Sequence, residues 1–199
     1  MSWRSILEFW FGTLINGIAA EEIRERWFVS NPDFDQACAK LCRSTLAEVA
    51  TLNHWLDQPD SCLAYIILTD QMPRNIFRGS NQAFAFDHLA LAAAKQGIER
   101  GHDQRLEWDQ RAFFYLPYEH SEAILDQHTA VGLFTGLRDQ APKQHRSLMG
   151  NSLRFAQQHR DIILRFGRFP HRNEVLGRTS TAEESKFIAE GDGFGQKAT

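Results

Sequence analysis

The chain has 199 residues, of which 43% are hydrophobic and 24% are charged, and its formal net charge is −3. This is the composition of an ordinary globular protein that is long enough to bury one sizeable core. A slightly acidic chain lacks the basic surface on which general nucleic-acid binding depends, so we predict no nucleic-acid partner.

Helical patterns fill the first part of the chain. Apolar residues recur at helical spacing over 2–11 and 21–28, which predicts two short amphipathic helices. Asn31 and Pro32 then form a start signal, an N-cap followed by proline at the first helical position. The helix that they open is predicted to reach about residue 55.

The chain contains three cysteines, Cys38, Cys42 and Cys62. An odd and low number argues against a disulfide framework and for a reducing compartment. No Cys-x-x-Cys or Cys-His spacing suggests zinc. The longest apolar run near the start, 9–20, is interrupted by polar residues and is too short to cross a bilayer. We therefore predict a soluble, cytoplasmic protein with no membrane partner and no cofactor.

The stretch 70–79 carries the most unusual chemistry of the chain. The apolar segment before it places Asp70 on the face of a helix that is otherwise marked for the core. A buried carboxylate needs a cation, and Arg74 and Arg78 are the nearest candidates. Pro73 has no N–H to donate and disfavours helix at the residue before it, so the helix is predicted to break or kink here.

More helices are predicted after this stretch, and no alternating strand pattern with hairpin turns is present. The sequence therefore predicts an all-α fold of about nine helices, in a single domain over 1–190 that is followed by a flexible tail over 191–199. The predicted later helices cover 81–99, 106–116 with a break at Pro117, 121–140, a long helix that ends at Gly167, and a short helix opened by a capping-box pattern at 179–184.

The pattern at 70–79 has an echo at 166–178, where a large apolar residue is again followed by proline and then by an Arg-Asn pair. Pro117 marks a third break. Helix ends expose unpaired backbone groups and can direct polar side chains into one cleft. We therefore predict that the breaks at Pro73, Pro117 and Pro170 converge on one site. The alternative is that each is an independent turn whose charges pair internally.

Arginine dominates the two matching strings, and its planar guanidinium group suits carboxylates and phosphates. No His-Glu-x-x-His motif is present, and we predict no metal. The predicted ligand-binding residues are Arg74, Asn75, Arg78, Arg168, Arg172 and Asn173. The candidates for a catalytic role are Glu119, His120 and His171, and the predicted buried structural charges are Asp70 and His159.

Three functions are compatible with these residues. The first is a binding module that holds a small anionic ligand or an acidic peptide end in an arginine-lined cleft. The second is a hydrolase or transferase that acts on an anionic substrate with Glu119 or His120 as general base. The third is a protein-interaction scaffold. The absence of a Gly-x-Ser-x-Gly elbow and of a phosphate-binding loop favours binding over catalysis.

The strings at 70–79 and 166–178 resemble those of a bacterial family known only as domain of unknown function 924. The family's string has Phe where this chain has Met72, which leaves the proline break intact. The resemblance implies a helical fold similar to the tetratricopeptide superhelix, although no tetratricopeptide signature is visible, and it implies no activity. Further matches in the same order lie at 9–12, 84–87, 115–122 and 176–181.

Overall fold

The computed structural model describes residues 2–191. Within that range the chain is helical and contains no β-strand, apart from one isolated bridge between Ile15 and Ile18. The all-α prediction is confirmed. The tetratricopeptide-like superhelix and the single domain over 1–190 stay predictions. The tail predicted over 191–199 lies, except for Gly191, outside the described residues.

The first half of the chain follows the sequence signals closely. Ser2 caps the first helix by accepting a hydrogen bond from the Ser5 N–H, and Asn31 caps the third through the N–H groups of Asp33 and Phe34. The third helix ends before the predicted residue 55, because two 3-10 turns replace its last part. The α-helices are α1 (Trp3–Phe11), α2 (Glu21–Phe28), α3 (Pro32–Ala47), α4 (Pro59–Ile66) and α5 (Met72–Ile76).

The second half contains α6 (Asp87–Glu99), α7 (Trp108–Glu119), α8 (Ile124–Gln140), α9 (Arg146–Phe166) and α10 (Ala182–Glu190). Thr181 and Glu184 form the capping box that opens α10, as the sequence indicates. The predicted break at Pro117 is wrong, because α7 continues to Glu119 with the proline inside it. Every residue from Phe113 to Glu119 is buried, and this packing compensates for the one backbone hydrogen bond that proline removes.

At Pro73, where the sequence predicts a break or kink, the chain stays helical and only the type of helix changes. The chain runs from α4 into α5 through a π-helical turn, Ile67–Gln71, in which the Met72 N–H bonds the Ile67 carbonyl. The wider turn places Pro73 in the first turn of α5, where a missing N–H is tolerated. All five residues of the π-helical turn are buried, so it lies in the interior of the molecule.

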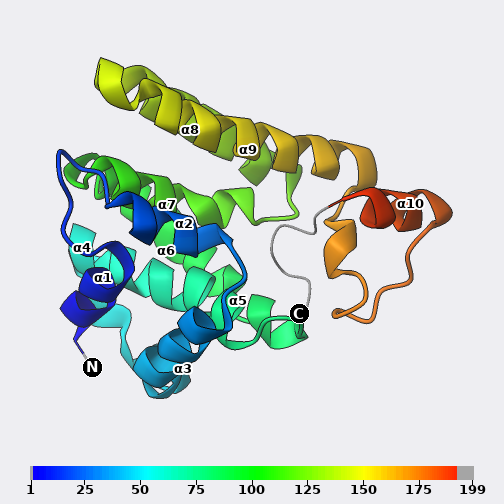
Figure 1. Ribbon diagram of the computed structural model, residues 1–199, viewed down its shortest axis with the longest axis horizontal. Coiled ribbons are helices and arrows are strands. Elements are labelled where there is room, and N and C mark those ends of the chain that lie inside the picture. Colours follow the sequence, from blue (N-terminus) through cyan, green and yellow to red (C-terminus); the bar gives the residue numbers. More distant parts are fainter. Residues whose placement is uncertain (1, 192–199) are drawn as a thin grey trace.

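The helices pack around α4, which is buried along nearly its whole length. Helices α8 and α9 lie side by side along one edge of the molecule, and α10 with the segment before it projects to one side (Figure 1). The main core extends from α1 to the middle of α9, while Ile162, Ile163 and Phe169 form a second, smaller apolar cluster near α10. The segment 167–173 therefore lies where the projecting part meets the main body.

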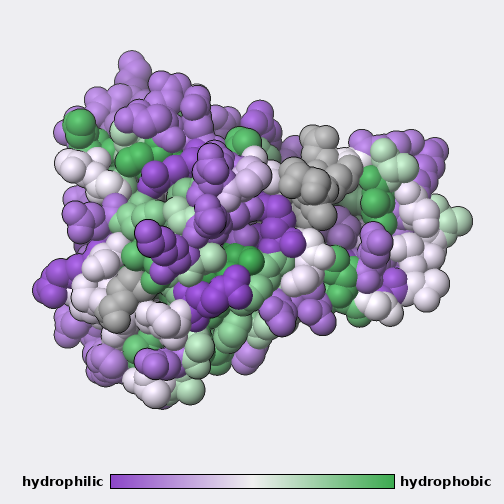
Figure 2. Space-filling model, turned by 60° about the horizontal axis from the view of Figure 1, so that its bottom comes forward, coloured by the Kyte–Doolittle hydropathy of each residue, from purple (hydrophilic) through white to green (hydrophobic). Residues whose placement is uncertain are grey.

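Figure 2 shows one side of the molecule, on which hydrophilic and hydrophobic residues alternate in small patches. No single continuous apolar face is visible among the described residues on this side. The C-terminal part projects from the main body in the same view. Among residues 2–191, none of the helices combines the length and the apolar character that crossing a bilayer requires.

Candidate functional site

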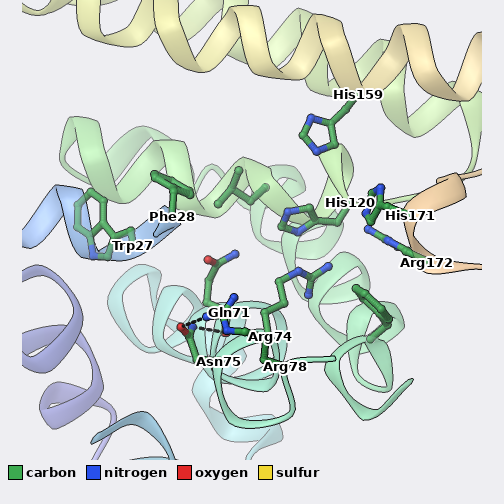
Figure 3. Close-up of a pocket in the computed structure, with 12 residues that line it drawn as sticks. Trp27, Phe28, Gln71, Arg74, Asn75, Arg78, His120, His159, His171 and Arg172 are labelled. Carbon is green, nitrogen blue, oxygen red and sulfur yellow. Dashed lines mark hydrogen bonds between the residues drawn. The ribbon is translucent and has the colours of Figure 1, made fainter. Parts of the chain in front are cut away.

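A cavity of about 80 Å³ lies where the three proline-containing segments meet (Figure 3). Residues that follow each of the prolines line it, so the predicted convergence of the three segments is found. The aromatic rings of Trp27 and Phe28 lie at one end of it in Figure 3. The lining residues are Trp27, Phe28, Gln71, Arg74, Asn75, Arg78, Phe84, Leu116, His120, His159, His171 and Arg172.

Asp70 lies behind the cavity wall and is completely buried. Its Oδ1 atom is 2.8 Å from His120 Nδ1 and 3.3 Å from Arg74 Nη1, and the Gln71 side-chain amide donates to Oδ2. Burial alone would raise the pKa of Asp70, but the Arg74 charge and the His120 hydrogen bond bring it well below its usual range. Asp70 is therefore an ionised carboxylate that accepts hydrogen bonds from two sides.

Arg74 lines the cavity, but protein carboxylates occupy its guanidinium group. Nη1 and Nη2 donate to the two oxygens of Asp87 at 2.7 and 2.9 Å, and Nη1 also donates to the Asp70 carbonyl at 2.6 Å. Burial would lower the pKa of Arg74, yet Asp70 and Asp87 together raise it above its ordinary value. Arg74 is thus a fixed structural cation as well as a wall of the cavity.

Arg172 differs from Arg74, because its guanidinium group makes no hydrogen bond to the described residues. Its side chain is only 8% exposed, and its shortest ionic contact is 3.6 Å, from Nη1 to the Asp87 oxygen that Arg74 already binds. It lies between the rings of Phe84 and Phe169, at 4.6 and 4.5 Å from their centroids. Burial and the nearby Arg74 charge lower the pKa of Arg172 to about 10, so it stays protonated at neutral pH.

His120 presents an acceptor atom to the cavity. Burial, followed by the Arg74 charge, lowers the pKa of His120 and outweighs the opposite effect of Asp70, so the ring is neutral at pH 7. Because ionised Asp70 can only accept, the proton of the neutral ring lies on Nδ1. Nε2 is then unprotonated, and the ring points into the cavity in Figure 3.

Glu119 and His159 form a second carboxyl–imidazole pair, in which His159 Nδ1 lies 3.1 Å from Glu119 Oε1 and 2.9 Å from the Phe155 carbonyl. Burial and the Asp70 charge raise the pKa of Glu119 to about 8, and burial lowers that of His159 to about 3. The pair is therefore uncharged at neutral pH. Glu119 does not line the cavity, and its proton makes it a poor general base, which leaves His120 for that role.

The other predicted ligand-binding residues lie in different surroundings. Arg78 lines the cavity but binds Asp35 through two hydrogen bonds of 2.8 Å, and Asn75 lines it with its amide turned to the Gln71 carbonyl. Arg168 and Asn173 do not line the cavity. Arg168 binds Glu184 at 2.6 and 2.8 Å, and the Asn173 amide donates to Ser180 Oγ at 3.0 Å.

His171 lines the cavity beside Arg172, and burial together with the Arg172 charge lowers its pKa to about 3. Asp87 and Phe84, which hold the two arginines in place, are not among the residues predicted from the sequence. Both residues belong to the string 84–87 that carries part of the family resemblance, and that string was the available signal. No group of three or more His, Cys, Asp or Glu side chains in residues 2–191 is arranged to hold a metal ion.

Comparison with known proteins agrees with this fold, but it assigns no biochemical activity to the chain. The chain resembles a solved structure, that of a protein of unknown function from Agrobacterium tumefaciens, with 38% sequence identity and a TM-score of 0.80. The match covers 95% of this chain and 97% of the other. None of the curated proteins compared with the chain matches it. A family model described as "Bacterial protein of unknown function (DUF924)" matches residues 6–192, and the chain therefore belongs to the DUF924 family.

Proposed function

We propose that the protein binds a small anionic ligand or an acidic peptide end in the cavity, and that Arg172 is its anchor. The observation that supports this proposal is the state of the Arg172 side chain, a cation that is more than nine-tenths buried and makes no hydrogen bond to any of residues 2–191. A buried cation whose N–H groups make no hydrogen bond is unfavourable, and a bound anion supplies the missing hydrogen bonds. Asp87 does not supply them here, because its nearest oxygen lies 3.6 Å from Arg172 Nη1 and both of its oxygens already accept from Arg74.

The size and charge of the cavity limit the ligand. A single water needs roughly 10–15 Å³ of such space, so about 80 Å³ takes a group of only a few non-hydrogen atoms. A carboxylate or phosphate group fits that limit. The side chain of Phe28 is largely exposed beside the cavity, and it offers an apolar surface to any part of the ligand that extends outward.

Titration calorimetry with inorganic phosphate and with acetate at low salt tests the proposal. Wild-type protein is expected to bind at least one of the two anions, with an affinity that falls as NaCl is added. Arg172→Gln is expected to abolish binding. Arg168→Gln is the matched control, because Arg168 is paired with Glu184 outside the cavity. Equal affinities in wild-type protein and Arg172→Gln, with the same melting temperature, would overturn the proposal.

A second candidate function, a hydrolase that acts on an anionic substrate, is supported by the Asp70–His120 pair. A carboxylate that fixes the Nδ1–H of a histidine leaves Nε2 free to accept a proton from a nucleophile. None of the lining residues carries a hydroxyl, thiol or amine, so the nucleophile would be water. Release of nitrophenol from p-nitrophenyl phosphate, lost in His120→Gln, tests this candidate.

We also infer that the protein works in the cytoplasm. Its three cysteines are free and buried, and burial raises the pKa of each thiol to about 12, so the thiols are unreactive and suited to a reducing compartment. If no anion binds, the protein-interaction scaffold becomes the preferred interpretation.

A further inference from the structure

We propose that the ligand carries a hydroxyl donor as well as a negative charge, and that His120 Nε2 accepts the hydrogen bond from that hydroxyl. This inference rests on the proposed function and names the chemistry that the cavity selects. Hydrogen phosphate, a phosphoryl group in its monoprotonated form and a 2-hydroxycarboxylate have this chemistry, whereas sulfate and a simple carboxylate lack the donor at neutral pH.

The orientation of His120 follows from its contact with Asp70. His120 Nδ1 lies 2.8 Å from Asp70 Oδ1, and the Gln71 amide donates to the other carboxylate oxygen. Both oxygens of Asp70 thus act as acceptors, and Nδ1 must be the donor. Turning the ring over would break this bond to a completely buried carboxylate, so the arrangement is fixed.

The charges around His120 keep Nε2 unprotonated. Two cations, Arg74 on α5 and Arg172 on the 3-10 turn Pro170–Arg172, line the same cavity as the ring. Two anions lie beside them: Asp70 contacts both His120 and Arg74, and Asp87 contacts both arginines. His159 and His171, on α9 and the same 3-10 turn, are uncharged, and so is Glu119 on α7. A third cation among these groups is unfavourable, which agrees with the lowered pKa of His120.

The cavity therefore offers two complementary contacts to one ligand. Arg172 can only donate, and it recognises the negative oxygens. His120 Nε2 can only accept, and it requires a hydrogen atom on the ligand. An anion that presents only lone pairs would place an oxygen against Nε2 and leave a buried acceptor unsatisfied, which costs free energy. For this reason, a site that hydrogen-bonds a hydroxyl group of its ligand rejects analogues without that hydroxyl.

Two matched pairs of anions test the inference by titration calorimetry at pH 7 and constant ionic strength. Phosphate is compared with sulfate, which has the same shape, and glycolate is compared with acetate. The inference predicts that the hydroxyl-bearing member of at least one pair binds about tenfold more tightly or better. Preference within the first pair identifies a phosphoryl ligand, and preference within the second identifies a hydroxycarboxylate.

The negative outcomes separate the two proposals. Equal affinities within both pairs, all lost in Arg172→Gln, would overturn the hydroxyl requirement and leave the anion-binding proposal standing. Absence of binding by all four anions would overturn both. The tautomer is checked in wild-type protein by long-range ¹H–¹⁵N correlation spectra, in which His120 is expected to carry its proton on Nδ1. A proton on Nε2 would contradict the inference independently of any binding result.

Discussion

Asp70 holds two residues of the cavity wall in place. Its carboxylate is completely buried and lies 2.8 Å from His120 Nδ1 and 3.3 Å from Arg74 Nη1. Asp70→Ala would leave a buried cation without one of its counterions, and we expect the free energy of unfolding to fall by roughly 3–5 kcal/mol. Urea unfolding measures the change. A loss within about 0.5 kcal/mol, the size of an ordinary surface substitution, would contradict this account of Asp70.

Glu119 gives the stability of the protein a distinctive pH dependence. Because its pKa is raised from 4.5 to about 8, the folded protein keeps a proton that the unfolded chain loses within this range. His159 and His171 act in the opposite direction between about pH 3 and 6.5, where the unfolded chain gains protons that the folded protein lacks. Up to pH 6.5, Glu119 lowers the free energy of unfolding as the pH rises, while His159 and His171 raise it. Above pH 6.5 only the decrease from Glu119 remains.

We therefore expect the free energy of unfolding to decrease between pH 6.5 and 8, by at most about 1.4 kcal/mol per pH unit. Glu119→Gln has no proton to lose and keeps a neutral amide beside His159, so its stability should change little over the same range. Urea unfolding at a series of pH values compares the two proteins. Identical slopes would mean that Glu119 is ionised in the folded protein.

The residue types at the site could be read from the sequence, but their partners could not. Helical periodicity places Asp70 on a buried face, and it is buried. The string 166–178 contains both Arg168 and Arg172, yet Arg168 is bound by Glu184, whereas Arg172 makes no hydrogen bond within the described part of the chain. That difference depends on contacts between elements far apart in the sequence, such as Arg78 with Asp35, which no local pattern encodes.

At the scale of the elements, the close packing of α6 against α4 and α7 depends on Gly97. A Cβ atom at this position would lie 2.4 Å from Phe114 Cζ and 3.2 Å from Cys62 Sγ. Alanine is the better helix former by up to about 1 kcal/mol, but overpacking of a buried contact costs roughly 1–3 kcal/mol. We expect Gly97→Ala to lower the melting temperature.

Gly132 is the matched control for Gly97. It also lies inside a helix, α8, but a Cβ atom there meets no other atom within 4 Å. Gly132→Ala should therefore raise the melting temperature through helix propensity alone. Thermal unfolding of the two variants gives shifts of opposite sign if α6 is packed as described, and a rise in both would contradict it.

The positions of the helices were largely predictable, whereas the effects of proline were not. Local capping signals at Asn31 and Thr181 mark helix starts that the structure contains. The sequence predicts a break or kink at Pro73 and a break at Pro117, but the chain stays helical at both. A π-helical turn accommodates the first, and burial of the whole last turn of α7 accommodates the second. Both solutions depend on tertiary packing, which local propensity does not contain.

At the scale of the whole molecule, the fold brings three distant segments to one cavity. The echo between 70–79 and 166–178 suggested that these segments act together, and both contribute to the lining. Phe169 belongs to the small apolar cluster beside α10 and also contacts Arg172, so packing of the projecting part positions the proposed anchor. The sequence alone could not show this, because the order of the helices in space determines it.

A crystal structure of the wild-type protein grown in phosphate tests the central claim most directly. The account predicts a tetrahedral anion in the cavity, within hydrogen-bond distance of the Arg172 terminal nitrogens and of His120 Nε2. A cavity that contains only water, with Arg172 turned onto a carboxylate of the protein, would contradict it.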